Sequence, residues 1–132
     1  MRVGILTGGG DAPGLNNVIR GVVTQGINAY KYEFVGFKDG WKGPLEGLTR
    51  PVTLADVAHI NDEGGTILGS SRTNPIKIEN GVARIEENLK KLNVDALVAI
   101  GGDQKVVLMA NDYVTISSSA NTDSWISVLE IS

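Results

Sequence analysis

The sequence predicts an α/β domain of the doubly wound kind, built on a mainly parallel sheet with a β-prone tail. Short apolar runs of β type alternate with segments of helical periodicity up to about residue 104. Two of these runs end abruptly in glycine clusters, at residues 8–10 and 101–102. Strand, helix and strand in succession favour parallel pairing through right-handed crossovers. Together these features predict helices on both faces of one sheet.

The first 37 residues predict a strand, a glycine loop, a helix and a second strand. Residues 2–7 form a short apolar run, and residues 8–14 read G-G-G-D-A-P-G. Apolar residues then recur at helical spacing from Leu15 to Val23, and we expect Gly26 to end this helix. Pro13 suits a helix start, because its missing N–H would have no partner there. Residues 33–37 are the second predicted strand.

The rest of the chain divides near residue 105. We expect a Gly/Pro-rich loop at 39–47, a short helix at 54–60 and a short extended segment entering a loop at 64–72. An amphipathic helix at 82–92 precedes a buried parallel strand at 96–100. Beyond residue 105 the runs 106–109, 113–116 and 126–131 are β-prone. We therefore predict a domain at 1–105 and a tail at 106–132 that packs on the sheet or extends it.

Composition excludes several classes of protein. The chain has 132 residues, enough to bury the core of one domain, and its net charge of -3 argues against a nucleic-acid partner. No apolar run approaches the roughly 20 residues that cross a bilayer, so we expect no membrane partner. With no cysteine, disulfides and thiolate metal sites are excluded. No signal-peptide pattern is present, and we expect a cytoplasmic protein.

The two glycine clusters are the candidate binding loops. Ligands of open parallel sheets bind outside the carboxyl ends of the strands, where both clusters are predicted to lie. Glycine lets backbone N–H groups approach a phosphate, and a neighbouring Asp can hold Mg²⁺ against phosphate oxygens. Neither loop is a standard fingerprint, since Pro13 replaces the last glycine of G-x-G-x-x-G and no G-x-x-x-x-G-K-[ST] occurs. The alternative is that the glycines only make tight turns between strands and helices.

Four segments of the chain carry distinctive motifs: L-T-G-G-G-D-A-P-G-L-N at 6–16, I-R-G-V-V at 19–23, G-G-T-I-L-G-S-S-R-T-N-P at 64–75 and D-A-L-V-A-I-G-G-D at 95–103. They resemble the 6-phosphofructokinase family, in family order and at family spacing over about residues 1–104. G-P-L-E-G at 43–47 and the R-T-N-P ending look most like the bacterial branch that contains pyrophosphate-using members. Residues 105–132 do not match the family pattern.

The resemblance implies phosphoryl transfer from ATP or pyrophosphate to the 1-hydroxyl of fructose 6-phosphate, with Mg²⁺ as cofactor. The residues that it implies at the donor phosphates are Gly10, Arg72, Thr73, Gly102 and Gln104. The guanidinium of Arg72 suits phosphate oxygens because its donors form a planar fork. Asp103 would hold Mg²⁺. Trp41 corresponds to an aromatic residue near the nucleotide base, or else packs on the core, and Asp11 caps the first helix or contacts the ligand.

Two departures from the family limit what we expect of this chain. In the family, glycine at the position of residue 104 is usual in enzymes that use ATP, and aspartate in those that use pyrophosphate. Here the residue is Gln104, so it does not indicate which phosphoryl donor the chain would bind. The general-base motif T-I-D-N-D and the sugar-phosphate arginines are missing. Transfer requires both reactants to be positioned, so we expect no useful kinase turnover from the chain alone, and fructose 6-phosphate to bind only if the missing half is supplied.

Three readings of the whole chain follow. In the first, it is a truncation, a fusion or an engineered chimera of a 6-phosphofructokinase that binds at most the donor and Mg²⁺. In the second, it is a non-catalytic scaffold or assembly module that keeps the α/β fold. In the third, it is a small-molecule kinase with a G-G-D loop, similar to NAD or lipid kinases. A parallel sheet with an open edge also favours a homodimer.

Overall fold

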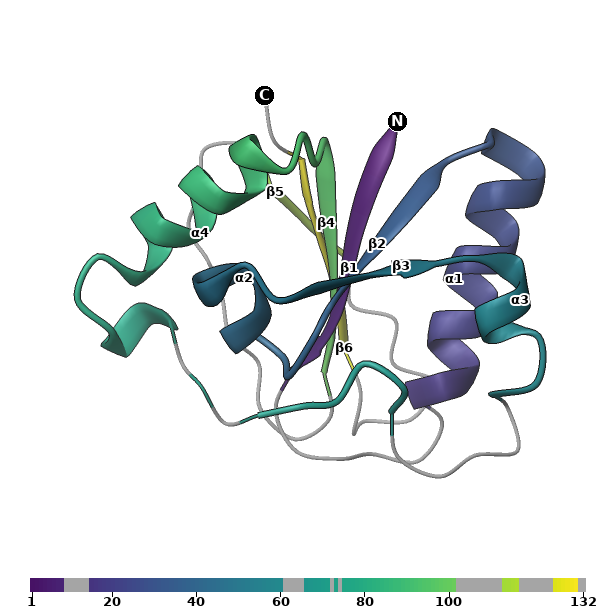
Figure 1. Ribbon diagram of the computed structural model, residues 1–132, viewed down its shortest axis with the longest axis horizontal. Helices are drawn as coiled ribbons and strands as arrows, with labels where there is room; N and C mark the ends of the chain where they lie inside the picture. The colour runs from purple at the N-terminus through teal and green to yellow at the C-terminus, as the bar shows by residue number, and fades with distance from the viewer. Residues whose placement is uncertain are drawn as a thin grey trace.

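The computed structural model describes residues 1–8, 15–60, 66–71, 73, 75–101, 113–116 and 125–130. Its strands form one six-stranded sheet in the order β3-β2-β1-β4-β6-β5 (Figure 1). Their bounds are β1 (Arg2–Gly8), β2 (Glu33–Phe37), β3 (Thr49–Val52), β4 (Ala96–Gly101), β5 (Tyr113–Ile116) and β6 (Trp125–Glu130). β1 pairs in parallel with both β2 and β4, and the flanking pairs are antiparallel. The predicted α/β fold with a parallel centre is confirmed.

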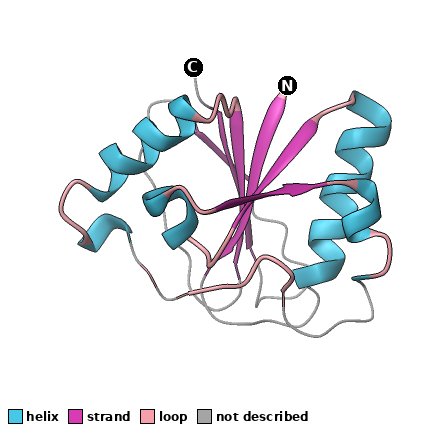
Figure 2. Cartoon of the chain, viewed as in Figure 1, coloured by secondary structure: helices cyan, strands magenta, loops and turns pink. Residues whose placement is uncertain are grey.

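Helices cover both faces of this sheet, as a doubly wound fold requires (Figures 1 and 2). α1 (Leu15–Tyr30) and α3 (Leu54–Val57) lie on one face, and α2 (Lys42–Glu46) and α4 (Gly81–Lys91) lie on the other, after the short 3-10 helix η2 (Pro75–Lys77). Successive side chains of a strand point to opposite faces. In β1, Val3 and Ile5 therefore join the core under α1, while Leu6 joins the core under α4.

The first helix is longer than expected. Gly26 was predicted to end it, but α1 continues to Tyr30, so that prediction is wrong. A Cβ on Gly26 would lie 2.5 Å from Cζ of Phe34, so the glycine makes room for the ring of Phe34 in β2. The helix ends where Lys31 adopts a φ of 57° and its N–H donates to the carbonyl of Ile27.

The segment at 39–47 was predicted to be a loop, but its second half forms α2. Nδ2 of Asn88, on α4, donates to the carbonyls of Pro44 and Leu45 at 2.7 and 3.0 Å. Leu45 is also buried against α4. A tertiary contact thus stabilises a five-residue helix that carries glycine and proline and has no local helix signal. The strand β3 that follows was not predicted; it pairs antiparallel with β2 at one sheet edge.

The remaining elements follow the sequence closely. A short helix was expected at 54–60, and the structure has the shorter α3, which ends at Val57 and begins with a capping box of Thr53 and Asp56. The helix expected at 82–92 is α4. Residues 66–69 form a turn, closed by a bond from Gly69 N to the carbonyl of Thr66, where an extended segment was expected.

The β-prone runs at 113–116 and 126–131 correspond to β5 and β6, and the run at 106–109 lies outside the described residues. β6 pairs antiparallel with β4 along its whole length, and β5 pairs with β6. The sheet therefore continues beyond β4 through these two strands. The division of the chain at residue 105 stays a prediction.

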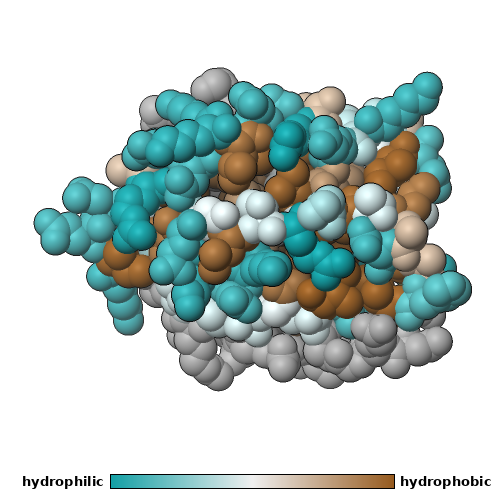
Figure 3. Space-filling view, viewed as in Figure 1, coloured by the Kyte–Doolittle hydropathy of each residue, from teal (hydrophilic) through white to brown (hydrophobic). Residues whose placement is uncertain are grey.

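The surface of the described residues is mixed in polarity. Figure 3 shows hydrophilic residues on the side where α4 lies, while apolar residues gather over the centre and right of this view. On α4, the ammonium of Lys91 lies 3.2 Å from the carboxylate of Glu87 in an exposed ion pair. Within the described ranges, no helix is both long and apolar enough to span a membrane.

Candidate functional site

The candidate site lies at the carboxyl ends of β1 and β4. Gly8 is the register partner of Gly101, so the two glycine-bearing strand ends lie side by side. β2 and β3 extend the sheet on one side of β1, and β4 lies on the other side. This is the point where the strand order reverses, at which open α/β sheets bind ligands. In Figure 1 it is the lower edge, along which residues 66–71 run in teal.

The loop at 66–71 is attached to β1 through Thr7. The Thr7 hydroxyl donates to the carbonyl of Gly69 at 2.7 Å and lies 2.9 Å from the hydroxyl of Thr66. Leu68 N donates to the same Thr66 oxygen at 3.2 Å. Thr7 has no exposed surface, so these bonds are shielded from water. A side chain at the end of β1 therefore fixes both sides of the turn.

The same loop is attached to the first turn of α1 through Asn16. Its Oδ1 accepts from the backbone N–H of Ile67 at 2.8 Å, and only 3% of the residue is exposed. Within the described part of the chain, Thr7 and Asn16 are the two polar residues in the buried class. Both bond to the loop at 66–71. Buried polar side chains are expensive unless bonded, so this loop accounts for their presence.

A third attachment comes from the turn after β2. Asp39 and Gly40 have φ values of 60° and 64°, and Asp39 N donates to the carbonyl of Leu68 at 2.9 Å. The Ser71 hydroxyl donates to the carbonyl of Asp39 at 2.6 Å and lies 3.1 Å from the hydroxyl of Thr73. A Cβ on Gly40 would lie 3.1 Å from both Ser71 N and the Thr7 carbonyl. The left-handed backbone and the close approach both require glycine there.

Trp41 packs into the core below this turn. It is 3% exposed and lies in the cluster that contains Phe37, Leu45 and residues of α4. Its Nε1 has no hydrogen-bond partner among the described residues, and it would lie 3.1 Å from a Cβ placed on Gly8. Core packing, one of the two roles expected for Trp41, is thus seen in the structure. Its contact with a nucleotide base stays a prediction.

Of the other predicted site residues, the structure describes only Thr73, which is half-buried beside Ser71. Gly10, Arg72, Gly102, Asp103 and Gln104 lie outside the described residues. In the part that is described, no group of three or more His, Asp and Glu side chains is placed to hold a metal. Sequence reasoning missed Thr7, Asn16 and Asp39. The signal available was a hydroxyl residue ending an otherwise apolar strand and an amide opening a helix.

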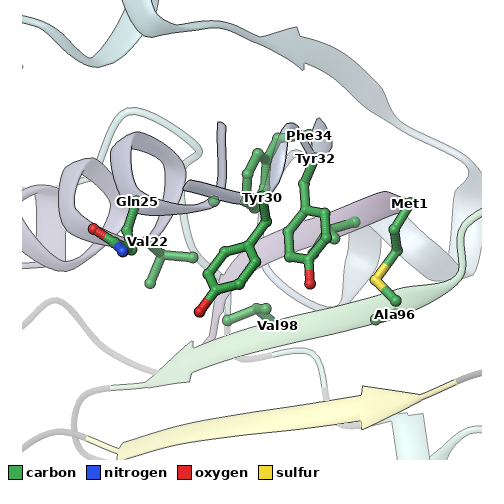
Figure 4. Close-up of a pocket in the computed structure, with 10 residues that line it drawn as sticks. Met1, Val22, Gln25, Tyr30, Tyr32, Phe34, Ala96 and Val98 are labelled. Carbon is green, nitrogen blue, oxygen red and sulfur yellow. The ribbon is translucent and has the colours of Figure 1, made fainter. Parts of the chain in front are cut away.

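A separate cavity of about 360 Å³ lies under α1, away from this edge (Figure 4). The rings of Tyr30 and Tyr32 stack there with centroids 5.3 Å apart, beside Met1 and over Val98 of β4. Gln25 of α1 supplies an amide group at its rim. No side chain lining this cavity carries a carboxylate, ammonium, guanidinium or imidazole group. It is an apolar site, unlike the phosphate-binding chemistry expected at the carboxyl edge.

Comparison with known proteins gives one consistent family. The family model described as Phosphofructokinase matches residues 2–114. A pyrophosphate–fructose 6-phosphate 1-phosphotransferase of Streptomyces coelicolor is 58% identical over 103 residues, and one of Amycolatopsis methanolica is 62% identical over 103 residues. ATP-dependent 6-phosphofructokinase 3 of S. coelicolor is 48% identical over the same length. Each match covers 78% of this chain and 30% of the relative.

Solved structures agree with the sequence comparison. The crystal structure of Pichia pastoris phosphofructokinase in the T-state matches with a TM-score of 0.70 and 31% identity, over 74% of this chain and 11% of that one. The structure of phosphofructokinase from Saccharomyces cerevisiae matches with a TM-score of 0.67 and 30% identity, over 74% and 13%. The chain therefore spans less than a third of the length of the relatives that it matches.

Proposed function

The chain belongs to the phosphofructokinase family, and on this premise we propose that it is the phosphoryl-donor-binding part of a 6-phosphofructokinase. The observation that carries the proposal is the attachment of the loop at 66–71 to the end of β1 and to the turn after β2. Ser71 and Thr73, which flank Arg72 in the sequence, lie in a segment bonded to the turn at Asp39. This segment borders the point in the sheet where phosphate ligands are expected.

We propose pyrophosphate as the donor in preference to ATP. Four relatives named as pyrophosphate-dependent enzymes are 56–62% identical to this chain, whereas those named as ATP-dependent are 44–48% identical. The burial of Trp41 agrees with this choice, because a side chain packed in the core presents little surface on which a base could stack. Gln104 replaces both of the residues usual at its position, so the preference rests on these two arguments.

The proposed roles of the donor-site residues follow from their chemistry. Arg72 would bind donor phosphate oxygens through its guanidinium, with Thr73 beside it, and Gly10 and Gly102 would offer backbone N–H groups. Mg²⁺ is held by one or two carboxylates together with phosphate oxygens and water, so a single residue such as Asp103 suffices on the protein side. When bound, the ion would neutralise charge on the donor phosphates.

Transfer to fructose 6-phosphate would need the remaining part of the longer relatives. Neither a general base nor sugar-phosphate arginines can be assigned in this sequence, and phosphoryl transfer depends on positioning both reactants. We therefore propose donor binding without turnover for this chain, in the cytoplasm. We also propose a homodimer, because self-association would cover the apolar cavity under α1.

Calorimetric titration tests the proposal. The chain is titrated with pyrophosphate and with ATP, each with and without Mg²⁺, alongside Arg72→Ala, Asp103→Ala and the control Lys91→Ala, which lies in the last turn of α4. We expect Mg²⁺-dependent binding of pyrophosphate that Arg72→Ala and Asp103→Ala weaken at least tenfold and Lys91→Ala leaves unchanged. No binding at millimolar ligand by a chain that unfolds cooperatively would contradict donor binding and favour the scaffold.

A further inference from the structure

We propose that Thr7 and Asn16 are positioning residues for the donor site, which act by holding the loop at 66–71 against the carboxyl edge of the sheet. The inference rests on the proposed function, because it assigns these residues to donor binding. Neither side chain is expected to touch the ligand. Each is bonded to the backbone of the turn that leads into Ser71, Arg72 and Thr73.

The direction of the bonds around Thr7 can be worked out from proton counts. A hydroxyl has one proton, and that of Thr7 is donated to the carbonyl of Gly69 at 2.7 Å. The 2.9 Å contact with Thr66 must then have Thr66 as donor. Thr66 in turn accepts from Leu68 N. The result is a directed chain from Leu68 N through two hydroxyls to the carbonyl of Gly69, in which each bond polarises the next.

Asn16 fixes the same turn from the opposite side of the first glycine loop. Thr7 comes just before that loop in the sequence, and Asn16 is the second residue of α1 after it. One side chain bonds Gly69 and Thr66, and the other bonds Ile67. The two elements that carry the first loop therefore also set the place of the second. The turn at 66–69 is thus held by the two elements that flank the first glycine loop in the sequence, which is a way to preorganise a site made from segments about 60 residues apart.

Packing alone does not explain the residue types. Thr7 is fully buried in a strand whose other inward residues are aliphatic, and valine has nearly the same shape as threonine. A hydroxyl in such a position is unfavourable unless it is bonded, and among the described residues the Thr7 hydroxyl bonds to Thr66 and Gly69 of the loop. The hydroxyl is thus needed for the loop and not for the core.

Two substitutions of Thr7 separate its role in holding the loop from its role in packing the core. Thr7→Val keeps the shape and removes the hydroxyl, whereas Thr7→Ser keeps the hydroxyl and removes a core methyl group. Ile85→Val, which removes one methyl group from the other core under α4, is the control for a modest loss of stability. The dissociation constant of pyrophosphate in the presence of Mg²⁺ is measured by calorimetry for each variant, alone and combined with Arg72→Ala.

We expect Thr7→Val to weaken pyrophosphate binding about tenfold, the change that one lost hydrogen bond of ordinary strength produces. Thr7→Ser and Ile85→Val should bind within about twofold of the unchanged chain, since neither removes a bond to the loop. In the Thr7→Val background, Arg72→Ala should cause a smaller further loss than it does in the unchanged chain. Rescue by serine and this coupling are effects that a purely packing role would not produce.

Three outcomes would overturn the inference. Binding by Thr7→Val that equals that of the unchanged chain, or weaker binding by Thr7→Ser than by Thr7→Val, would refute positioning while leaving donor binding intact. No pyrophosphate binding by the unchanged chain would refute both proposals together. If Thr7→Val does not fold, Asn16→Asp and Asn16→Leu give the same comparison, because Asp keeps the oxygen that accepts from Ile67 and Leu does not.

Discussion

Substituting Gly8 by alanine tests the packing of the carboxyl edge most directly. A Cβ at this position would lie 3.1 Å from Nε1 and 3.2 Å from Cδ1 of Trp41, closer than relaxed contacts allow. Trp41 is 3% exposed and sits among Phe37, Leu45 and Leu6, so the indole has little freedom to retreat. The new methyl group should therefore act as an overpacking substitution of the core.

The expected magnitude is the difference of two effects. Overpacking destabilises the fold by about 1–3 kcal/mol. Replacing glycine within a strand stabilises it by about 0.5–1 kcal/mol, because the unfolded chain then has less conformational entropy to lose. We expect Gly8→Ala to lower the free energy of unfolding by about 1 kcal/mol, which for a chain of this length lowers Tm by about 4 °C. Gly21→Ala on α1 is the matched control. Nothing lies within 4 Å of its Cβ, so it should stabilise by about 0.5–1 kcal/mol.

Urea denaturation of Gly8→Ala, Trp41→Ala and the double variant gives the coupling between the two residues. Alanine at position 41 lacks the indole ring whose Nε1 and Cδ1 would touch the new methyl group, so Gly8→Ala should cost nothing measurable in that background. The coupling expected is about 1–2 kcal/mol. An unchanged stability of Gly8→Ala, or an equal cost with tryptophan and with alanine at position 41, would refute the argument that Trp41 is why residue 8 is glycine.

Two further predictions concern α3 and α4. The backbone N–H of Thr53, and then its hydroxyl, hold the pKa of Asp56 below its usual value of 3.8, with Arg50 a smaller influence. Because the pKa of Asp56 is lower in the folded chain, the capping box stabilises the fold above about pH 4 and loses this effect as the pH falls through the folded pKa. Asp56→Asn should therefore remove this part of the acid dependence of stability, measured by denaturation from pH 6 to pH 2. A pH profile of stability that Asp56→Asn leaves unchanged would contradict the prediction. Asn88→Ala removes both bonds to the carbonyls of Pro44 and Leu45 and should destabilise by about 1–3 kcal/mol in urea, whereas Lys91→Ala, whose ion pair with Glu87 is exposed, should change stability by less than about 0.5 kcal/mol.

The sequence predicted elements whose signal is local. β1, β2, β4 and α4 appear within about one residue of their expected bounds, because apolar periodicity alone marks them. Where the prediction failed, a distant residue decides the structure. Gly26 lies inside α1, where it makes room for the ring of Phe34 in β2, and α2 is held by Asn88 of α4. No pattern within either segment reports these partners.

The candidate site divides in the same way. The glycine clusters and the place where they meet could be predicted, since the ends of parallel strands share one edge of the sheet. Register confirms that Gly8 and Gly101 are opposite each other. The attachment of the loop at 66–71 to Thr7 and Asn16 could not be predicted from the sequence, because its hydrogen bonds join residues 51–62 positions apart. Such contacts follow from the fold and not from any local motif.

The glycines of this edge bear on how its function should be argued. Gly8 makes room for Trp41, and a Cβ on Gly69 would lie 2.7 Å from Oδ1 of Asp39. Gly40 has a left-handed backbone and touches Ser71. Each of these glycines is required by contacts within the protein, whether or not a phosphate binds. Gly8, Gly40 and Gly69 are therefore explained by packing. The case for a donor site depends on polar side chains and on what positions them, which is why Thr7 and Arg72 are the informative pair to vary.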